Sequence, residues 1–149
     1  MKFDLKKLKS QGKYVFPFTC SFEPDAAILD YPSAYFDGQA TISGTLDIMD
    51  TSVYVDAEIT VTVKGECSRC LSDASVTVSA LLQEEFAENG REEDGYTYSR
   101  GQLDLTAAAT EMLSLAMPVQ ILCKQDCKGL CPSCGANLNE TQCNCRNLG

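Results

Sequence analysis

The chain has 149 residues, a length that suits one domain with at most a small appended lobe. Hydrophobic residues make up 44% and charged residues 22%, which excludes a chain that is disordered by composition. The net charge of −9 disfavours contact with phosphate backbones over most of the surface. The absence of histidine excludes Ser-His-Asp triads, Cys-His dyads and catalytic zinc held by histidine.

The chain has no run of apolar residues long enough to span a membrane. Its N-terminal stretch, MKFDLKKLKS, lacks the apolar centre of a secretory signal. The cysteine count of nine is odd, which favours a reducing compartment over one in which disulfides form. We therefore expect a cytoplasmic protein without membrane contact.

Basic residues gather at the N-terminus, where residues 1–13 contain five lysines and a single acid, Asp4. Residues 4–10 predict a short amphipathic helix with Leu5 and Leu8 on one face. The segment is either a solvated terminal turn or an arm that contacts RNA or a protein partner. Under the second interpretation, the contacting side chains are those of Lys6, Lys7 and Lys9.

Residues 13–22 predict a strand, and Pro17 restricts it to a sheet edge or a bulge because proline cannot donate a ladder hydrogen bond. Cys20 is expected on the buried face of this strand, as a small hydrophobic residue. Residues 23–37 contain two prolines and several aspartates, and they predict a loop.

The clearest pattern is the alternation of apolar and polar residues from Val53 to Val63, which predicts a long strand with one buried face. Residues 40–86 as a whole predict a three-stranded antiparallel meander. The strand leads directly into Cys67-Ser-Arg-Cys70, so this cysteine pair is expected at or near the tip of a hairpin.

Residues 88–95 are charged and predict an exposed loop, and residues 96–103 predict one more short strand. Residues 104–117 predict the main helix, with Asp104 at its N-terminal end and Pro118 after its C-terminal end. The apolar side of this helix is expected to pack on the sheet. Its members are Leu105, Ala109, Met112 and Ala116, with Ala108 and Leu115 beside them.

Six of the nine cysteines lie between Cys123 and Cys145, with the spacing C-x3-C-x3-C-x2-C-x8-C-x-C. Thiolates two or three residues apart can share one tetrahedral zinc ion. The spacing therefore predicts two structural zinc sites that use eight of the cysteines. The expected ligands are Cys67, Cys70, Cys123 and Cys127 in one site, and Cys131, Cys134, Cys143 and Cys145 in the other.

Several alternatives stay open for the cysteines. The division of the ligands between the two sites is open, because a neighbouring cysteine could take the place of Cys127. Disulfides, a redox-active C-x2-C pair and an iron–sulfur cluster compete with zinc, but the compartment and the absence of a thioredoxin-like setting favour zinc. Arg69 and Lys128 lie beside the cysteines, where they either compensate thiolate charge or contact RNA.

These elements predict an α+β protein, mainly an antiparallel β meander with one packed helix and a C-terminal zinc-ribbon-like lobe. Residues 1–122 are expected to form a β-rich domain that carries the basic N-terminal arm and the helix at 104–117. Residues 123–149 are expected to form the cysteine-rich zinc-binding lobe. Because sites made only of cysteine are closed to substrates, we expect a structural role for the metal and no enzymatic activity.

Three motifs together resemble the YceD family, the large ribosomal RNA subunit accumulation proteins. They are the C-x-R-C pair at Cys67–Cys70, the helix from Asp104-Leu105 to Pro118, and CK-x-x-CKGLCP-x-CG-x-NLN-x-x-x-C-x-C from Cys123 to Cys145. The resemblance implies a ribosome-biogenesis factor for the accumulation or processing of large-subunit ribosomal RNA. Expected partners are a ribosomal precursor, a basic ribosomal protein or an RNA-processing enzyme, with direct RNA contact as a further option. The competing hypotheses are an RNA-acting, nuclease-like enzyme and a purely structural zinc-binding interaction module.

Overall fold

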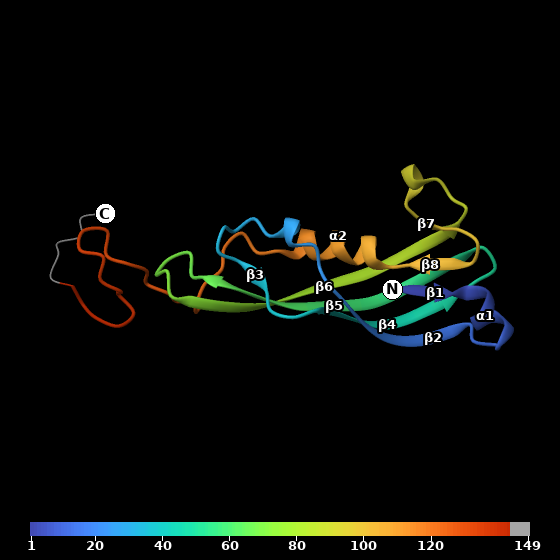
Figure 1. Cartoon of the computed structure of the whole chain (residues 1–149), viewed down its shortest axis with the longest axis horizontal. Helices are drawn as coiled ribbons and strands as arrows, with labels where there is room; N and C mark the ends of the chain where they lie inside the picture. The colour runs from blue at the N-terminus through green and yellow to red at the C-terminus, as the bar shows by residue number, and fades with distance from the viewer. Residues whose placement is uncertain (144–149) are drawn as a thin grey trace.

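The structure, a computed structural model, describes residues 1–143, with the side chain of Glu92 excepted. Figure 1 shows an elongated molecule in which the N-terminal elements and the cysteine-rich C-terminal segment lie at opposite ends. The strands are β1 (Lys2–Asp4), β2 (Val15–Phe22), β3 (Tyr35–Phe36), β4 (Ala40–Ile48), β5 (Ser52–Glu66), β6 (Asp73–Glu88), β7 (Tyr96–Tyr98) and β8 (Gln102–Asp104). The helices are α1 (Leu5–Ser10), α2 (Thr106–Ala116) and the single-turn 3₁₀ helices η1 (Ala26–Ile28) and η2 (Glu92–Asp94).

The main sheet has the strand order β2-β4-β5-β6-β7, and β3 also pairs with β5. The strands β4, β5 and β6 form the predicted antiparallel meander, since each pairs antiparallel with the next. The β5–β6 hairpin is paired along its whole length, from Ser52 opposite Ala87 to Glu66 opposite Asp73. The cysteine pair at residues 67–70 therefore lies in the connection at the tip of this hairpin, as the sequence predicted.

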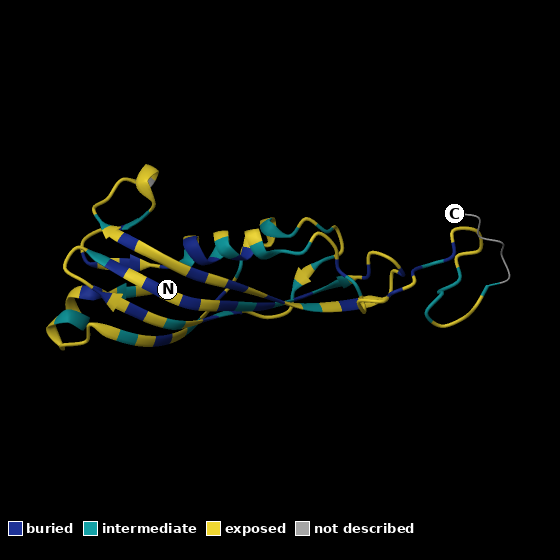
Figure 2. Ribbon diagram, turned by 180° about the vertical axis from the view of Figure 1, so that it is seen from behind, coloured by how far each residue is buried: buried dark blue, intermediate teal, exposed yellow. Residues whose placement is uncertain are grey.

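One face of β5 forms the core, and the other face is largely exposed to solvent. Along β5, six alternate residues from Val53 to Val63 are at most 3% exposed, while Tyr54, Asp56 and Glu58 between them are exposed. Figure 2 shows the same alternation of buried and exposed residues along the long strands. The pattern follows from the two-residue repeat of a strand, which places successive side chains on opposite faces.

The strand β2 is an edge strand, because within residues 1–143 its one pairing partner is β4. Pro17 thus lies in an edge strand, as its missing N–H group predicted. Phe18 and Phe22 are buried on the core side, and Cys20 lies between them in the alternation. Cys20 is only partly buried, although it packs against the core.

The helix α2 packs against β6 above the sheet, as predicted, but its buried side differs from the predicted stripe. The fully buried residues are Leu105, Ala108, Ala109 and Leu113, and Leu115 is 75% exposed. Met112 and Ala116 are only partly buried. The burial of Leu113 was not predicted from the sequence. Met112 and Leu113 lie seven and eight positions after Leu105, and both positions fit the apolar side of a helix. The small alanines on either side do not discriminate between the two choices.

Residues 96–103 form two short strands instead of the single predicted one. The strand β7 pairs with β6 in parallel, and β8 pairs antiparallel with β1 in a separate two-stranded sheet. A tight turn joins them, in which Arg100 and Gly101 have φ angles of 56° and 70°. The sheet is therefore mainly, but not entirely, antiparallel.

The basic N-terminal segment is part of the folded body. The strand β1 pairs with β8, and the backbone N–H of Leu5 donates to the carbonyl of Gly101 at 2.8 Å. Leu5 is 1% exposed, so the predicted helix is anchored by a core side chain. The Asp4 carboxylate accepts from the backbone N–H of Lys7 and caps the start of α1.

No helix in the described part of the chain is long and apolar enough to cross a membrane.

Candidate metal centre

Four cysteines from distant parts of the chain meet beside the tip of the β5–β6 hairpin. The Sγ atoms of Cys67 and Cys127 are 3.6 Å apart, and those of Cys70 and Cys123 are also 3.6 Å apart. All four sulfur atoms lie within 4.8 Å of one another. Three of the residues are buried, and Cys123 is exposed. We call these four residues the first cluster.

The hairpin tip is folded by its own backbone. The N–H of Cys67 donates to the carbonyl of Ser72 at 2.7 Å, and the N–H of Leu71 donates to the carbonyl of Cys67 at 3.0 Å. Leu71 has a φ angle of 64°, a left-handed conformation that lets the chain reverse within a few residues. This turn brings Cys67 and Cys70 to the same side of the hairpin.

The segment after α2 is joined to this tip by paired hydrogen bonds. Ser68 donates its backbone N–H to the carbonyl of Ile121, and Ile121 donates its N–H to the Ser68 hydroxyl oxygen. Ile121 is 1% exposed, so its buried side chain also holds this segment against the hairpin tip. These interactions position the chain so that Cys123 and Cys127 follow at the hairpin tip.

Arg69 adds a third connection across the cluster. Its guanidinium Nη1 donates to the carbonyl oxygen of Cys127 at 2.9 Å. The backbone of Gly129 passes so close to Arg69 that a Cβ on that glycine would lie 3.4 Å from the Arg69 carbonyl oxygen. The arginine between the two cysteines of the C-x-R-C motif thus holds the partner segment in place.

The thiols of the first cluster differ in their acidity. Burial raises the pKa of Cys67, but hydrogen bonds from the backbone of Cys70, Cys123 and Arg69 outweigh it and lower the pKa to about 6. Burial raises the pKa of Cys123 to about 12, and its thiol contacts with Cys70 and Cys127 add to the increase. Four neighbouring thiols cannot all ionise without a cation, because each thiolate opposes the next. The Cys67 thiol is therefore more acidic than the Cys123 thiol.

The donor set fits one tetrahedral metal ion. A zinc–sulfur distance of about 2.3 Å places the sulfurs of a tetrahedral site ~3.8 Å apart. The distance of 3.6 Å in the Cys67–Cys127 and Cys70–Cys123 pairs and the upper limit of 4.8 Å for the whole set bracket that separation. The first cluster could hold a metal ion, and its thiols are the ligands that zinc prefers.

A second cluster lies further along the same segment. The Sγ atoms of Cys131, Cys134 and Cys143 lie within 4.8 Å of one another. The N–H of Gly135 donates to the carbonyl of Cys131 at 2.9 Å, and Gly135 has a φ angle of 75°, which glycine adopts without strain. Backbone hydrogen bonds from Cys134 and Ser133 lower the pKa of Cys131 to about 6. This cluster could also hold a metal ion.

The fourth predicted ligand of the second cluster, Cys145, lies outside the described residues. The other seven predicted ligands fall into the two groups that the spacing indicated. Ligation of metal by these cysteines remains a prediction.

Sequence reasoning missed two asparagines that connect the clusters. Asn139 Nδ2 donates to Cys127 Sγ at 3.3 Å, and the backbone N–H of Lys128 donates to Asn139 Oδ1 at 2.9 Å. Asn137 Oδ1 accepts from both the backbone N–H and Nδ2 of Asn139. Both asparagines belong to the sequence Asn137-Leu138-Asn139, which is part of the motif that begins at Cys123. That motif was the feature of the sequence from which their role could have been predicted.

The five predicted contact residues do not form one patch. Lys6, Lys7 and Lys9 belong to α1 at the N-terminal end of the molecule, whereas Arg69 and Lys128 accompany the first cluster. Figure 1 shows that these two regions lie at opposite ends. Arg69 is also committed to the Cys127 carbonyl, which leaves its guanidinium less free for a partner.

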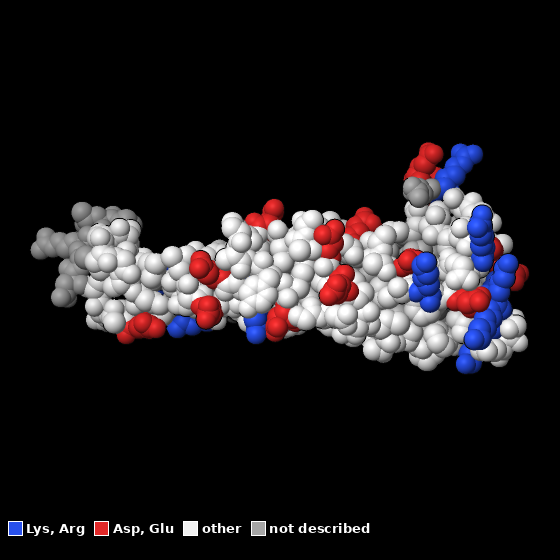
Figure 3. Space-filling model, in the orientation of Figure 1, with Lys and Arg blue, Asp and Glu red and all other residues white. Residues whose placement is uncertain are grey.

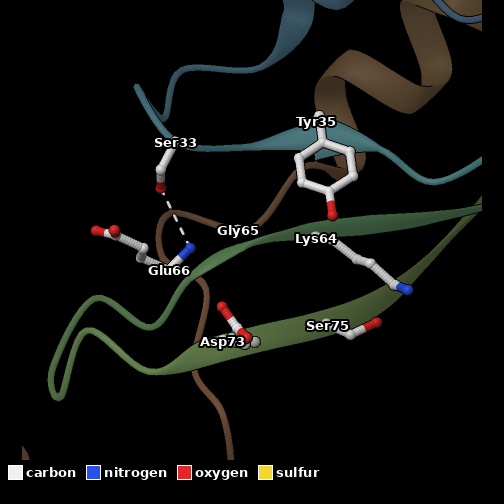
Figure 4. A pocket seen from close by; sticks show the side chains of 8 residues that line it. Ser33, Tyr35, Lys64, Gly65, Glu66, Asp73 and Ser75 are labelled. Atoms are coloured by element: carbon white, nitrogen blue, oxygen red, sulfur yellow. Dashed lines mark hydrogen bonds between the residues drawn. The ribbon is translucent and has the colours of Figure 1, made fainter.

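A hollow of about 430 Å³ lies near the tip of the β5–β6 hairpin, between the Ser33–Tyr35 segment and the ends of β5 and β6. Figure 4 shows Ser33 near Glu66, whose backbone N–H donates to the Ser33 hydroxyl at 3.2 Å. Lys64 lines the hollow but forms an ion pair with Asp37 at 3.1 Å. The charge of Lys64 is thus compensated by Asp37, and Glu66 and Asp73 also line the hollow. This mixture of charges gives the hollow little selectivity for a charged ligand.

One family model matches most of the chain. It is described as "Large ribosomal RNA subunit accumulation protein YceD", and it matches residues 55–148. The match begins within β5 and extends through both cysteine clusters, so it includes all the predicted metal ligands.

Several curated proteins are similar to the chain. An uncharacterized protein of Mycobacterium bovis is 30% identical over 100 residues, which are 62% of this chain and 48% of that protein. One from Mycobacterium leprae is 28% identical over 100 residues, 62% of this chain and 46% of that protein. A Zea mays protein named "Large ribosomal RNA subunit accumulation protein YCED homolog 1, chloroplastic" is 39% identical over 46 residues, 30% of this chain and 16% of that protein.

The chain spans about half the length of the mycobacterial relatives it matches. No solved structure matches the chain.

Proposed function

Because the chain belongs to the YceD family, the large ribosomal RNA subunit accumulation proteins, we propose that it is a ribosome-biogenesis factor that acts by binding and not by catalysis. Its partner is a precursor of the large ribosomal subunit. Binding would support the accumulation of large-subunit ribosomal RNA by holding the precursor in a form that matures.

The observation that carries this proposal is the separation of charge along the molecule. Lysines and arginines gather at the end that contains β1, α1 and the β7–β8 turn, while Asp and Glu dominate the middle of the visible face (Figure 3). The Lys6 side chain lies against the β7–β8 turn, since a Cβ on Gly101 would lie 2.8 Å from Lys6 Cγ. We call this surface the basic end, and it consists of Lys2, Lys6, Lys7, Lys9, Lys13 and Arg100.

The charges of the basic end are available to a partner. Among the described side chains, the ion pairs within 4.0 Å join the amino terminus to Asp104 and Lys64 to Asp37, so none uses a residue of the basic end. Lys9 Nζ donates to the backbone carbonyl of Asp50, which leaves its charge uncompensated by a direct ion pair. Phosphates of RNA are attracted here and repelled by the acidic middle.

A precursor particle offers both kinds of partner surface. Its RNA phosphates suit the basic end, and its basic ribosomal proteins suit the acidic middle of the molecule. The orientation of the chain on the particle would follow from this opposition of charge. A reducing compartment such as the cytoplasm completes the proposal, since thiolates hold zinc only while they stay reduced.

Two structural zinc ions hold the C-terminal part in this proposal. The eight cysteines named above are the ligands, residues 123–149 form a zinc-ribbon-like lobe, and residues 1–122 form the sheet domain. Closed sites with four sulfur ligands leave no open position for a substrate, which supports a structural role for the metal.

The test is co-sedimentation with large-subunit precursors at increasing salt. The Lys6→Glu/Lys7→Glu variant is compared with Lys124→Glu/Lys128→Glu, which changes the net charge equally at the opposite end. The first variant should lose most binding and reduce the slope of log affinity against log salt by about 1 for each lysine that contacts a phosphate. The second should bind like the wild type.

Three outcomes would contradict the proposal. Loss of binding only in the Lys124→Glu/Lys128→Glu variant would move the contact to the cysteine end. Wild-type binding by both variants would remove the role of the basic end. Cleavage of the precursor RNA by the purified wild-type chain would identify an RNA-acting enzyme instead.

A further inference from the structure

The side chain of Asn139 connects the two cysteine clusters, and we propose that it couples their zinc affinities, so that filling the second cluster strengthens zinc binding at the first. The inference rests on the proposed zinc sites. It assigns a positioning role to a residue that does not itself bind metal.

The hydrogen bonds of Asn139 define which way its amide faces. The backbone N–H of Lys128 needs an acceptor and lies 2.9 Å from Asn139 Oδ1. The Nδ2 group must therefore face the other way, where Cys127 Sγ is 3.3 Å from it. Asn137 Oδ1 accepts from Asn139 Nδ2 at 3.0 Å and from the Asn139 backbone at 3.0 Å, so the amide is held from two sides.

Asn139 belongs to the loop that the second cluster closes. It lies between Cys134 and Cys143, whose Sγ atoms are within 4.8 Å of each other. The loop folds back onto the segment that carries Cys127. The N–H of Leu138 donates to the Gly129 carbonyl at 2.9 Å, and Leu130 and Asn137 form an antiparallel bridge. Closure of this loop by metal would therefore fix the position of the Asn139 amide.

The amide in turn acts on the first cluster. A zinc ion with four thiolates carries a net charge of −2, and an N–H donor stabilises the sulfur that carries part of it. Residues that orient or hydrogen-bond metal ligands typically change metal affinity about 10-fold to 100-fold when they are removed. Asn139 is placed to do this at Cys127, a ligand of the first cluster, from a loop that depends on the second.

Coupling of this kind is reciprocal. If an occupied second cluster raises the affinity of the first by some factor, an occupied first cluster raises the affinity of the second by the same factor. Loss of either metal would then weaken retention of the other. The two ions would load and leave together more often than independent sites allow.

The experiment measures zinc release from the full-length protein into a chromophoric chelator. Release should occur in two phases, and the phase that survives in Cys134→Ser belongs to the first cluster. Both Asn139→Ala and Cys134→Ser should weaken first-cluster affinity about 10-fold to 100-fold. The double variant should be no weaker than either single variant, because both changes remove the same contact.

Two further variants isolate the contact. Asn139→Asp keeps the oxygen that accepts from Lys128 but replaces the donor to Cys127 with a repelling carboxylate, so it should weaken zinc at least as much as Asn139→Ala. Gln142→Ala removes an exposed carboxamide from the same loop and should leave affinity unchanged. Cobalt substitution adds a second readout, since the sulfur-to-cobalt absorption bands of the first cluster should shift in the Asn139 variants and stay unchanged in Gln142→Ala.

The outcomes separate the two proposals. If the wild type binds no zinc at the first cluster, the zinc proposal itself is wrong. If the wild type binds zinc and Asn139→Ala retains it within about twofold, or if the double variant shows the sum of two independent losses, only the coupling is overturned.

Discussion

The sulfur atoms of Cys67 and Cys127 lie 3.6 Å apart, although 60 residues separate them along the chain. This contact joins the tip of the longest hairpin to the segment that follows the main helix. If the first cluster holds zinc as proposed, metal binding would contribute about 10–16 kcal/mol at neutral pH, more than the stability of many whole domains, and would dominate the local stability.

Removal of one ligand from the second cluster should release one metal ion. In Cys131→Ser, we expect one zinc equivalent fewer per chain and loss of structure in the segment after Leu130, while the sheet persists, since its core uses separate residues. Elemental analysis and hydrogen exchange measure the two effects. Cys20→Ser is the control and should keep the full metal content; an unchanged zinc content in Cys131→Ser would contradict the assignment.

The close approach of β4 and β5 depends on Gly44. A Cβ at this position would overlap the carbonyl oxygen of Asp56 and would lie 2.7 Å from Cβ of Ala57, so the strands would have to separate. We expect Gly44→Ala to lower the free energy of unfolding by about 3 kcal/mol. Denaturant unfolding measures it, with Thr45→Ala on the exposed face as the control. Equal stability of the two variants would show that the sheet adapts without cost.

The buried side of α2 can be tested with two leucines. Leu113 is fully buried and Leu115 is 75% exposed, although the sequence pattern favoured the second. Leu113→Ala should cost about 2–5 kcal/mol because it leaves a cavity beneath the helix. Leu115→Ala should change stability by no more than about 0.5 kcal/mol. The reverse order of the two losses would place the other side of α2 against the sheet.

Tyr96 should make stability depend on pH at high pH. Burial, followed by the hydrogen bond from its hydroxyl to Glu111 Oε2 at 2.8 Å, raises the pKa of Tyr96 from its ordinary value of 10.0 to about 12. The folded state thus favours the neutral phenol. This contribution is complete below the unfolded pKa of about 10 and is lost as the pH rises through about 12.

Tyr96→Phe removes that titration. We expect the variant to lose less stability than the wild type between pH 10 and pH 12, and to lack the latest tyrosinate absorbance step. Unfolding at several pH values and absorbance titration measure both effects. Tyr14→Phe, at an exposed tyrosine, is the control, and a parallel loss of stability in wild type and Tyr96→Phe would disprove the role of this phenol.

The sequence by itself determined the long strands and the grouping of the cysteines. The alternation from Val53 to Val63 is a local property, since one extended backbone puts every second side chain on the same face. The spacing of the cysteines likewise limits which sulfurs can share an ion, because two residues span little distance. The hairpin tip at Cys67 and Cys70 followed from these two patterns together.

The tertiary structure decided the features that depend on contacts between distant segments. The parallel pairing of β7 with β6 and the burial of Leu113 depend on how the segment after Glu88 packs against the sheet. No periodic pattern in the local sequence specifies that packing. The basic end arises because the pairing of β1 with β8 brings Arg100 beside the N-terminal lysines. The Asn139–Cys127 hydrogen bond likewise needs a loop to fold back over a neighbouring cluster. Local periodicity is set by backbone geometry, whereas these contacts are set by the burial and hydrogen bonding that become available only when the whole chain is packed.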